Sequence, residues 1–265
     1  MRLVDRFDGF VFDLDGTVYL DDVLLPGAAA TLAAVRDREA PHVFLTNKPL
    51  ERSEFYAGIL RGLGVSVADD QVVSSLDALV LYLLQRTPGA RVFCVSEPLV
   101  AEVLRESGFE VVRPDQAESA EVVAVSFDRT FDYGKLHAAY RAVKAGARIV
   151  ATNPDRFCPT ADGGLPDCAA MLAAIEACTG ARAEAIVGKP SRHMAAAVLD
   201  RLGLPAERVL VVGDRLMTDI ALASAAGMPS ALVLSGDSQM DDLEASEARP
   251  GFLLDTIAGL LDERD

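Results

Sequence analysis

The sequence predicts an α/β protein with a doubly wound, mainly parallel sheet and a second α/β domain formed by the middle of the chain. Short apolar, β-like segments alternate with longer segments in which apolar residues recur at helical spacing. The β-like segments are rich in Val, Ile, Leu and Phe, as strands are when helices cover both faces of a parallel sheet. Roughly ten such segments exceed what one compact doubly wound sheet usually carries, so we expect the middle series to form its own domain.

The first series of elements occupies the N-terminal third of the chain. The apolar run GFVFDLD predicts a strand over 9–15. Pro26 and Gly27 precede a run with apolar residues at helical spacing, which predicts a helix over 28–38. A strand over 43–47 (VFLTN), a helix over 51–62 and a strand over 72–75 (VVSS) complete this series.

The middle and last series repeat the alternation. The middle series has predicted strands over 91–96, 121–128 and 148–153 and predicted helices over 98–107, 133–145 and 166–178. The last series has predicted strands over 185–189, 209–214 and 231–235 and predicted helices near 191–202 and 218–226. The small-residue stretches TPGA (87–90) and GARAEA (180–185) bracket the middle series. We therefore expect one domain from 1–78 and 186–265 and an inserted domain over 79–185.

The charge balance limits the class of partner. Lys and Arg number 25 and Asp and Glu 40, which gives a formal net charge of −15 and a sequence pI near 4.6. Nucleic-acid backbones and anionic membrane surfaces both select basic patches, so neither is an expected partner. A small phosphorylated molecule remains compatible with the acidity, because it needs only a local cationic pocket or a metal.

Cysteines, histidines and apolar runs exclude several further classes of protein. The four cysteines form no CxxC pair, so we expect reduced thiols in a cytoplasmic protein rather than a disulfide scaffold. The three histidines lie far apart, without the spacing of a zinc site. No apolar run approaches the ~18 residues of a membrane span, and Asp5 and Asp8 precede any long apolar stretch, unlike a secretory signal.

Four polar clusters follow predicted strands, at the edge where open α/β sheets bind ligands. The first is DLDGT, which begins at Asp13. Two carboxylates one residue apart, Asp13 and Asp15, cannot both be buried as anions without a cation or a proton. Gly16 permits the sharp turn that lets them converge. Taken alone, such a cluster is also typical of an acidic turn after a strand.

The other three clusters add donors, a cation and two more carboxylates. Thr46 and Asn47 follow one strand and can donate hydrogen bonds to phosphate oxygens, and Lys189 of GKP can neutralise an anion. In GDRLMTDI, Asp214 directly follows a strand and Asp219 lies at the start of a helix. Each of these clusters alone is also typical of a helix cap or a solvated side chain. We interpret all four together as one site.

The combined chemistry of the clusters points to phosphoryl transfer. Hard oxygen ligands suit Mg²⁺, which keeps several waters and accepts one or two carboxylates plus substrate phosphate. An aspartate can attack phosphorus and form an aspartyl-phosphate. A metal and a lysine would then neutralise charge on the transferred group. The sequence therefore predicts a magnesium-dependent enzyme that acts on a phosphate ester.

The four clusters resemble, in order, the four motifs of the haloacid dehalogenase-like (HAD) phosphatases. FDYGKL (131–136), ATNPD (151–155) and the following GKPS are similar to subfamily IIA, which contains NagD-like, p-nitrophenyl phosphatase-like, phosphoglycolate phosphatase-like and pyridoxal phosphatase-like enzymes. The resemblance implies a Rossmann-like HAD core, built from both ends of the chain, with an inserted α/β cap of type C2. The predicted domain over 79–185 would be that cap.

The resemblance also implies roles for the strand-end carboxylates. Asp13 would be the nucleophile and a magnesium ligand. Asp15 would be the general acid/base that protonates the leaving alcohol, and its backbone carbonyl would bind the metal. Asp214 would ligate magnesium. Asp219 would either bind the metal directly or hydrogen-bond to a group that binds it.

The remaining implied roles concern the substrate. Thr46, Asn47 and Lys189 would hold the phosphoryl group. The loop after the ATN strand would approach the leaving group, which nominates five cap residues for substrate specificity: Asn153, Asp155, Phe157, Cys158 and Pro159.

Three positions depart from the family pattern. The second motif reads TNK, with Lys48 where the family commonly has Asn, and we expect this lysine at the surface. LPDCAAML, with Asp167 and Cys168, replaces a glycine-rich turn, and we expect these two residues near the specificity surface. Met217 stands where relatives often carry a polar or acidic residue. The first two departures, at Lys48 and at Asp167 and Cys168, fall near the expected specificity surface. They bear on the choice of substrate and leave the predicted core chemistry intact.

We therefore expect a cytoplasmic, magnesium-dependent hydrolase of phosphoric monoesters. Its substrate would be a small metabolite, such as a sugar phosphate, phosphoglycolate, glycerol phosphate, a nucleotide or pyridoxal phosphate. It would have no nucleic-acid or membrane partner and would form a homodimer through the cap. Three alternatives stay open: a dehalogenase of the same fold, which would need neither magnesium nor Asp15; a phosphomutase; and a non-enzymatic signalling module with an acidic pocket, which would lack the middle series.

Overall fold

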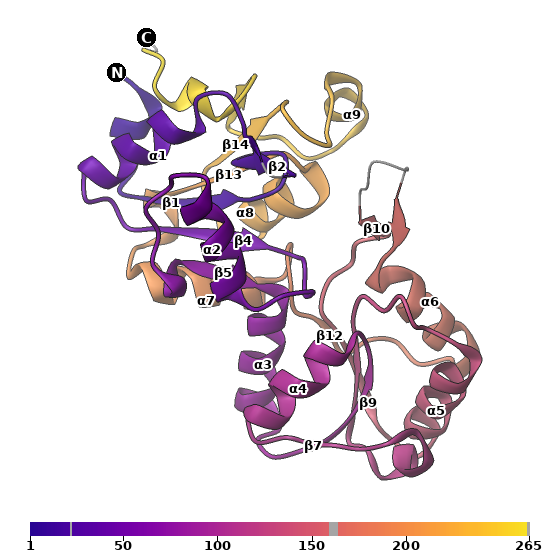
Figure 1. Cartoon of the computed structure of the whole chain (residues 1–265). Helices are drawn as coiled ribbons and strands as arrows, with labels where there is room; N and C mark the ends of the chain where they lie inside the picture. The colour runs from indigo at the N-terminus through magenta and orange to yellow at the C-terminus, as the bar shows by residue number, and fades with distance from the viewer. Residues whose placement is uncertain (22, 159–163, 264–265) are drawn as a thin grey trace. The chain divides into compact units, whose positions relative to one another are not determined.

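The computed structural model describes residues 1–21, 23–158 and 164–263. They belong to two units. Unit 1 comprises 1–46, 53–73 and 189–265, and unit 2 comprises 47–52 and 74–188. Unit 1 therefore combines the indigo N-terminal and orange-to-yellow C-terminal parts of the chain (Figure 1). Both units contain parallel sheets and helices, so the predicted α/β class is confirmed.

The sheet of unit 1 has six strands. Their order is β15 (Phe252–Leu254), β14 (Ser230–Val233), β13 (Val209–Gly213), β1 (Gly9–Asp13), β4 (His42–Thr46) and β5 (Val72–Ser74). β1 pairs in parallel with β13 on one side and with β4 on the other. Along the chain, β4 and β5 are added on one side of β1. The later strands β13, β14 and β15 are added on its other side. The strand order thus reverses between β1 and β13, which is where open α/β sheets bind ligands.

Helices and short turns connect the strands of unit 1. The helices are α1 (Ala28–Asp37), α2 (Ser53–Gly62), α7 (Arg192–Leu202), α8 (Ala221–Ala226) and α9 (Met240–Ala245). A two-stranded hairpin, β2 (Tyr19–Leu20) and β3 (Val23–Leu24), follows β1. α7 begins after Ser191, whose hydroxyl accepts a hydrogen bond from the N–H of His193 at 3.0 Å, as an N-cap residue does. Leu216–Ile220 form a π-helical turn that leads into α8, where the sequence predicted a regular helix over 218–226.

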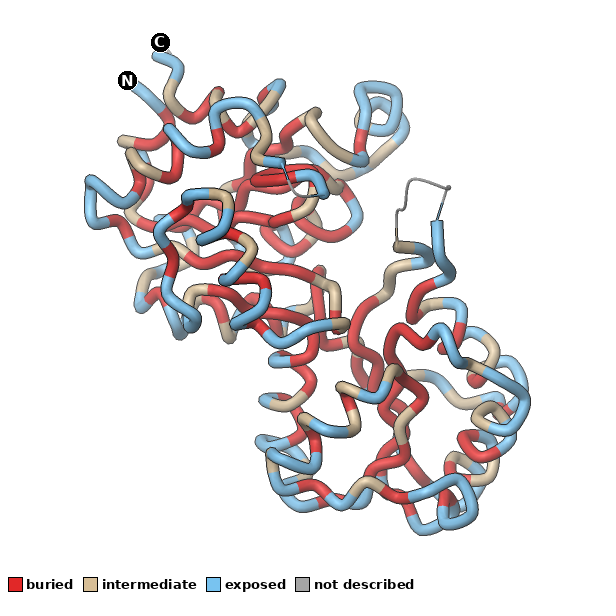
Figure 2. Tube along the Cα trace, in the orientation of Figure 1, coloured by how far each residue is buried: buried red, intermediate tan, exposed pale blue. Residues whose placement is uncertain are grey.

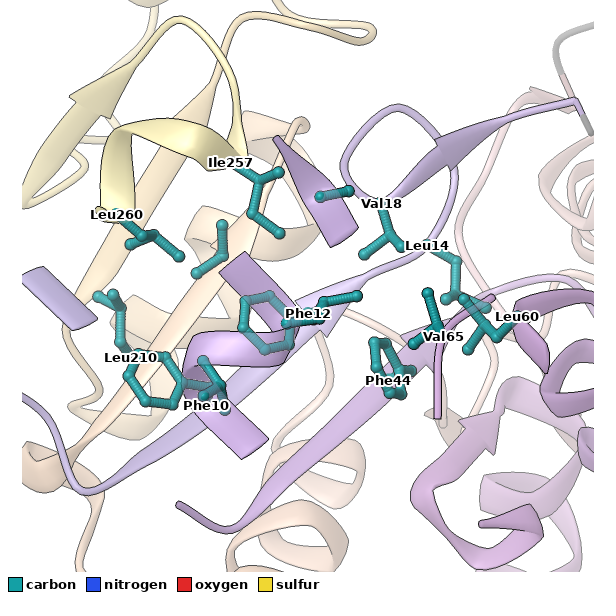
Figure 3. Packing of buried hydrophobic residues seen from close by; sticks show 14 of the residues in the cluster. Phe10, Phe12, Leu14, Val18, Phe44, Leu60, Val65, Leu210, Ile257 and Leu260 are labelled. Atoms are coloured by element: carbon teal, nitrogen blue, oxygen red, sulfur yellow. The ribbon is translucent and has the colours of Figure 1, made fainter. Parts of the chain in front are cut away.

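The apolar core of unit 1 lies against the sheet. Phe10 and Phe12 of β1 and Phe44 of β4 are fully buried, and Figure 3 shows them among Leu and Val side chains from both ends of the chain. The Phe12 ring centroid lies 5.8 Å from that of Phe10 and 5.9 Å from that of Phe44. Aromatic burial on this scale anchors β1 at the centre of the sheet.

Unit 2 has its own parallel sheet of five strands. Their order is β12 (Ala185–Ile186), β9 (Arg148–Ala151), β8 (Val122–Val125), β6 (Arg91–Val95) and β7 (Glu110–Val111). The helices are α3 (Ser75–Arg86), α4 (Pro98–Glu106), α5 (Tyr133–Lys144) and α6 (Cys168–Thr179). β10 (Phe157–Cys158) and β11 (Leu165–Pro166) form an antiparallel pair. In each unit the central strands are buried and exposed residues gather on helices and loops (Figure 2).

Some elements differ from the sequence predictions. The helix α3 was not predicted, and it groups with unit 2 together with residues 47–52 and 186–188. The chain passes from unit 1 to unit 2 at 46/47 and again at 73/74, the second time before α3 and near the expected boundary at 78/79. Within the described ranges, no helix has the length and apolar character needed to cross a membrane.

Candidate active site

The sheet of unit 1 brings two of the predicted carboxylates to its reversal point. Asp13 is the last residue of β1, and Asp214 directly follows β13. The two strands are in register, with Phe12 paired to Val212, so both side chains lie at the same edge. The sequence of each strand explains its position, because four apolar residues bury the strand and the polar residue comes only where it ends.

A third carboxylate, Asp219 from the π-helical turn, completes a compact acidic group. One carboxylate oxygen from each of Asp13, Asp214 and Asp219 lies within 4.8 Å of the others. The three residues are 7%, 2% and 1% exposed. Such closely spaced, buried anions repel one another and have lost most of their hydration, so they need a compensating positive charge.

Lys189 supplies one positive charge from the segment between β12 and α7. Its Nζ donates hydrogen bonds to Asp13 Oδ1 at 2.5 Å and to Asp219 Oδ1 at 2.7 Å. The residue is 3% exposed. Burial alone would lower the pKa of Lys189, but the charges of Asp13 and Asp219 outweigh burial and raise its pKa above the usual value. The ammonium therefore stays protonated at neutral pH.

One lysine does not balance three carboxylates. Burial, followed by the charge of Asp13, raises the pKa of Asp219 to about 6, although Lys189 opposes this shift. Burial and the charges of Asp13 and Asp219 also raise the pKa of Asp214 well above its usual value. Among the described residues, Asp214 Oδ1 is buried and has no hydrogen-bond partner. The group therefore favours either a proton or a further cation.

The turn after β1 lies against the carboxylate of Asp214. Gly16 has a φ of +78°, and a Cβ at this position would lie 2.5 Å from Asp214 Oδ2. Only glycine combines this left-handed backbone with such a close approach. Asp15, one residue earlier, is partly buried and is not a member of the three-carboxylate group. Of the four predicted metal residues, the structure thus brings together Asp13, Asp214 and Asp219 by their side chains.

Thr46 ends β4, the other neighbour of β1. Asp13 pairs with Leu45, which places Thr46 one residue further along at the same edge of the sheet. The residue is 2% exposed. The strand position predicted for Thr46 from the sequence is therefore the one observed.

Asn47 belongs to unit 2, where it forms a polar network with two of the nominated cap residues. Its Nδ2 donates to Asp155 Oδ2 at 3.0 Å. Its backbone carbonyl accepts from Asn153 Nδ2 at 3.0 Å and from Ser75 Oγ at 2.7 Å. Asn153 is fully buried. These contacts hold both the side chain and the backbone carbonyl of Asn47 within unit 2. The sequence did not predict this role for Asn153 and Asp155.

The other nominated cap residues lie on the β10–β11 pair. Phe157 is 44% exposed, unusual for a phenyl ring, and Cys158 is partly buried. Pro159 lies outside the described residues. Leu165, from the facing strand, is also exposed. The exposed Phe157 side chain is thus available for contact with another molecule.

The positions that depart from the family pattern have separate structural roles. Asp167 is the N-cap residue of α6, and its Oδ1 accepts from the N–H of Cys168 at 2.5 Å. Cys168 is fully buried, and burial raises the pKa of its thiol to about 11. Both residues thus begin and anchor a helix, and their expected position near the specificity surface stays a prediction. Lys48 is partly buried, and Met217 is 79% exposed.

Comparisons with known proteins identify the family. Residues 10–110 match the haloacid dehalogenase-like hydrolases, and residues 186–260 match a second HAD-hydrolase-like family. The sugar-phosphatase AraL of Bacillus subtilis is 33% identical over 94% of this chain and 90% of its own length. A 4-nitrophenylphosphatase structure from Thermotoga maritima has a TM-score of 0.91 and 36% identity, covering 98% of both chains. The chain belongs to subfamily IIA of the haloacid dehalogenase-like hydrolases.

This HAD protein is therefore a phosphatase that hydrolyses phosphomonoesters. A third relative, the glycerol phosphate phosphatase of Mycobacterium tuberculosis solved in complex with calcium, has a TM-score of 0.89 and 32% identity, and the match covers 99% of this chain and 77% of that one. The named relatives act on small phosphorylated compounds. The Asp13, Asp214 and Asp219 group fits the divalent cation that HAD phosphatases generally use, because its donors are hard carboxylate oxygens and Asp214 Oδ1 has no partner among the described residues.

One segment of this HAD site was missed from the sequence. Ser235–Ser238 follow β14 and contact both Asp214 and the Gly16 turn. The signal was present, because the segment follows a predicted strand, as Asp13, Thr46 and Asp214 do in the same sheet. SGDS alone is indistinguishable from an ordinary loop.

Proposed function

We propose that this phosphatase is a magnesium-dependent enzyme that hydrolyses a small phosphomonoester, such as a sugar phosphate, phosphoglycolate or glycerol phosphate, through an aspartyl-phosphate on Asp13. The observation that carries the proposal is the position of the Asp13 carboxylate. It lies at the reversal point of the sheet, accepts a hydrogen bond from Lys189 at 2.5 Å and is close to two further carboxylates. This arrangement orients a nucleophile and holds cationic charge beside it.

Asp13, Asp214 and Asp219 would hold the metal by their carboxylates, with the backbone carbonyl of Asp15 as a further ligand. When bound, Mg²⁺ supplies positive charge that offsets the negative charge of the transferred phosphoryl group. The unpartnered Asp214 Oδ1 and the raised pKa of Asp219 support this assignment. Three buried carboxylates outnumber the single Lys189 ammonium that contacts them, so the group favours a further cation.

The chain's own residues account for the bond changes. One oxygen of the Asp13 carboxylate attacks phosphorus while the bond from phosphorus to the leaving oxygen breaks, and Asp15 gives that oxygen a proton. Asp15 then takes a proton from water, which attacks the same phosphorus and releases phosphate and free Asp13. Thr46, Asn47 and Lys189 would hold the phosphoryl oxygens throughout.

We propose that unit 2 acts as the cap and that its residues select the leaving group. Phosphoryl contacts are shared by all candidate substrates, so discrimination requires contacts elsewhere. Phe157 is the strongest candidate because its ring is 44% exposed on a short β-pair. Asn153 would act through Asn47, since its buried amide donates to the Asn47 carbonyl. The cytoplasmic location and a homodimer formed through the cap stay predictions.

The test is phosphate release from a panel of phosphomonoesters with Mg²⁺, using the wild type and Asp13→Asn. This substitution keeps the size of the side chain and removes its charge and most of its nucleophilicity. We expect turnover of every ester to fall to background while circular dichroism remains that of the wild type. Turnover by purified Asp13→Asn at a substantial fraction of the wild-type rate would exclude the aspartyl-phosphate mechanism.

A further inference from the structure

The segment Ser235–Ser238 contacts Asp214 from the strand beside it. It directly follows Leu234, after β14, and β14 pairs in parallel with β13, the strand that carries Asp214. The segment is thus a further strand-end cluster, at the sheet edge where Asp13, Thr46 and Asp214 lie. We refer to it as the 235–238 segment.

Its hydrogen bonds converge on the Asp214 loop and on the turn after β1. The N–H of Asp237 donates to Asp214 Oδ2 at 2.7 Å, and the N–H of Ser238 donates to the Asp214 carbonyl at 3.1 Å. The hydroxyl of Ser238 accepts from the N–H of Leu216 at 3.1 Å. The hydroxyl of Ser235 donates to the carbonyl of Gly16 at 2.8 Å. Both the side chain and the backbone of Asp214 are therefore held by one short segment.

Gly236 allows this segment to approach the carboxylate. A Cβ at Gly236 would overlap the Oδ2, Cγ and Cβ atoms of Asp214. The backbone of Gly236 is not in the left-handed region, so its conformation does not itself require glycine. The close approach to Asp214 does.

As a result, the two carboxylate oxygens of Asp214 have different surroundings. Oδ2 accepts the Asp237 N–H, whereas Oδ1 is buried and has no partner among the described residues. A carboxylate with one oxygen fixed by the protein presents the other in a defined direction. Hydrogen bonds to a ligand in this way tune metal affinity.

We propose that the 235–238 segment is a positioning element that holds Asp214 for the divalent cation and thereby sets the affinity of the site for that cation. The proposal rests on the proposed function, in that it takes Asp214 to be a metal ligand. We call the segment a positioning element because its hydrogen bonds reach Asp214, Leu216 and Gly16.

The experiment measures metal binding without turnover. Mg²⁺ or Mn²⁺ alone is titrated calorimetrically into metal-free wild type and Gly236→Ala. We expect the substitution to weaken binding roughly 10- to 100-fold, the range found when groups that orient metal ligands are altered. Gly58→Ala is the matched control, since a Cβ at Gly58, in α2 of the same unit, meets no atom within 4 Å. It should bind metal as the wild type does.

A second pair of variants separates positioning from folding. Ser238→Ala removes the acceptor for Leu216 N–H, and Ser238→Thr retains a hydroxyl. We expect weaker metal binding in the alanine variant and recovery in the threonine variant. This pair decides the question if Gly236→Ala folds poorly. If the segment only stabilised the fold, the substitutions would instead lower the melting temperature of the metal-free protein and leave the metal Kd unchanged.

The outcomes distinguish this proposal from the proposed function. Wild-type affinity in both Gly236→Ala and Ser238→Ala overturns the positioning role and leaves the metal assignment intact. A wild type that binds neither cation counts against the metal assignment itself. Weaker binding in both variants, with recovery in Ser238→Thr, supports the proposal.

Discussion

Lys189→Met tests the charge balance of the site most directly. Methionine keeps much of the length and apolar character of the lysine side chain but carries no charge. In the wild type the Lys189 ammonium is buried and donates to Asp13 and Asp219. The variant would leave three buried carboxylates without the cation that two of them contact.

The expected loss of stability follows from that burial. Removing one partner of a buried ion pair costs about 3–5 kcal/mol, because the other charge stays buried and uncompensated. In a chain of this size, each 1 kcal/mol shifts the melting temperature by about 2–4 °C. The metal-free variant should therefore melt roughly 6–20 °C below the wild type.

The loss of stability in Lys189→Met should also depend on pH. The pKa of Asp219 is already raised to about 6, and without Lys189 it would rise further. An acid whose folded-state pKa exceeds its unfolded-state value of 3.8 binds its proton more tightly when folded, so stability falls as pH rises through that interval. Lys189 itself stays protonated throughout. The difference between variant and wild type should therefore be larger at pH 8 than at pH 5.

The assay is differential scanning calorimetry of both proteins in chelator at pH 5 and pH 8. Lys144→Met is the control, because Lys144 is an exposed residue of α5 whose Nζ donates to the carbonyl of Thr179 and pairs with no carboxylate among the described residues. Its loss should lower the melting temperature far less than the loss of Lys189. Equal melting temperatures for Lys189→Met and the wild type at pH 8 would refute the reasoning. So would a difference that is the same at both pH values.

Two further predictions concern the metal and the cap. Mg²⁺ should raise the melting temperature more at pH 7.5 than at pH 5.5. At the lower pH, protons compete with the metal for carboxylates whose pKa is raised, including that of Asp219 at about 6. A thermal shift that is equal or greater at pH 5.5 would contradict this. Phe157→Ala should change the ratios of kcat/KM among metabolite esters more than it changes turnover of p-nitrophenyl phosphate, whose activated leaving group needs less help. A uniform loss for all substrates, accompanied by a lower melting temperature, would show that Phe157 is a packing residue.

The sequence predicted most of the long elements, with the exception of α3, and missed several of the shortest strands. Apolar runs such as the one that ends at Asp13 coincide with β1, and the helix predicted over 28–38 corresponds to α1. Strands of two residues, such as β7 and β10, carry no periodic pattern. α3 was missed, and with it the passage from unit 1 to unit 2 at 73/74. Val73 and Ser74 lie at that passage without the glycine or proline that usually marks a break.

The convergence of Asp13 and Asp214 was predictable because parallel strands of one sheet end at a common edge. Lys189 follows β12 of the other sheet and reaches Asp13 from the segment between β12 and α7. The contacts of Asn47 were not predictable, because its partners Asp155 and Asn153 lie more than a hundred residues away along the chain. Hydrogen bonds between such distant residues depend on how a sheet and its loops pack. A polar dipeptide alone does not reveal them.

The strand order of unit 1 has a consequence for how the enzyme is made. β1 is synthesised first, yet its neighbour β13 follows about 200 residues later, after all of unit 2. At ~5–20 residues per second, the ribosome needs roughly 10–40 s to add that stretch. Until then Asp13 has neither Asp214 nor the strand that carries it. A polypeptide released early would contain the nucleophile and a complete unit 2, but it would have no phosphatase activity.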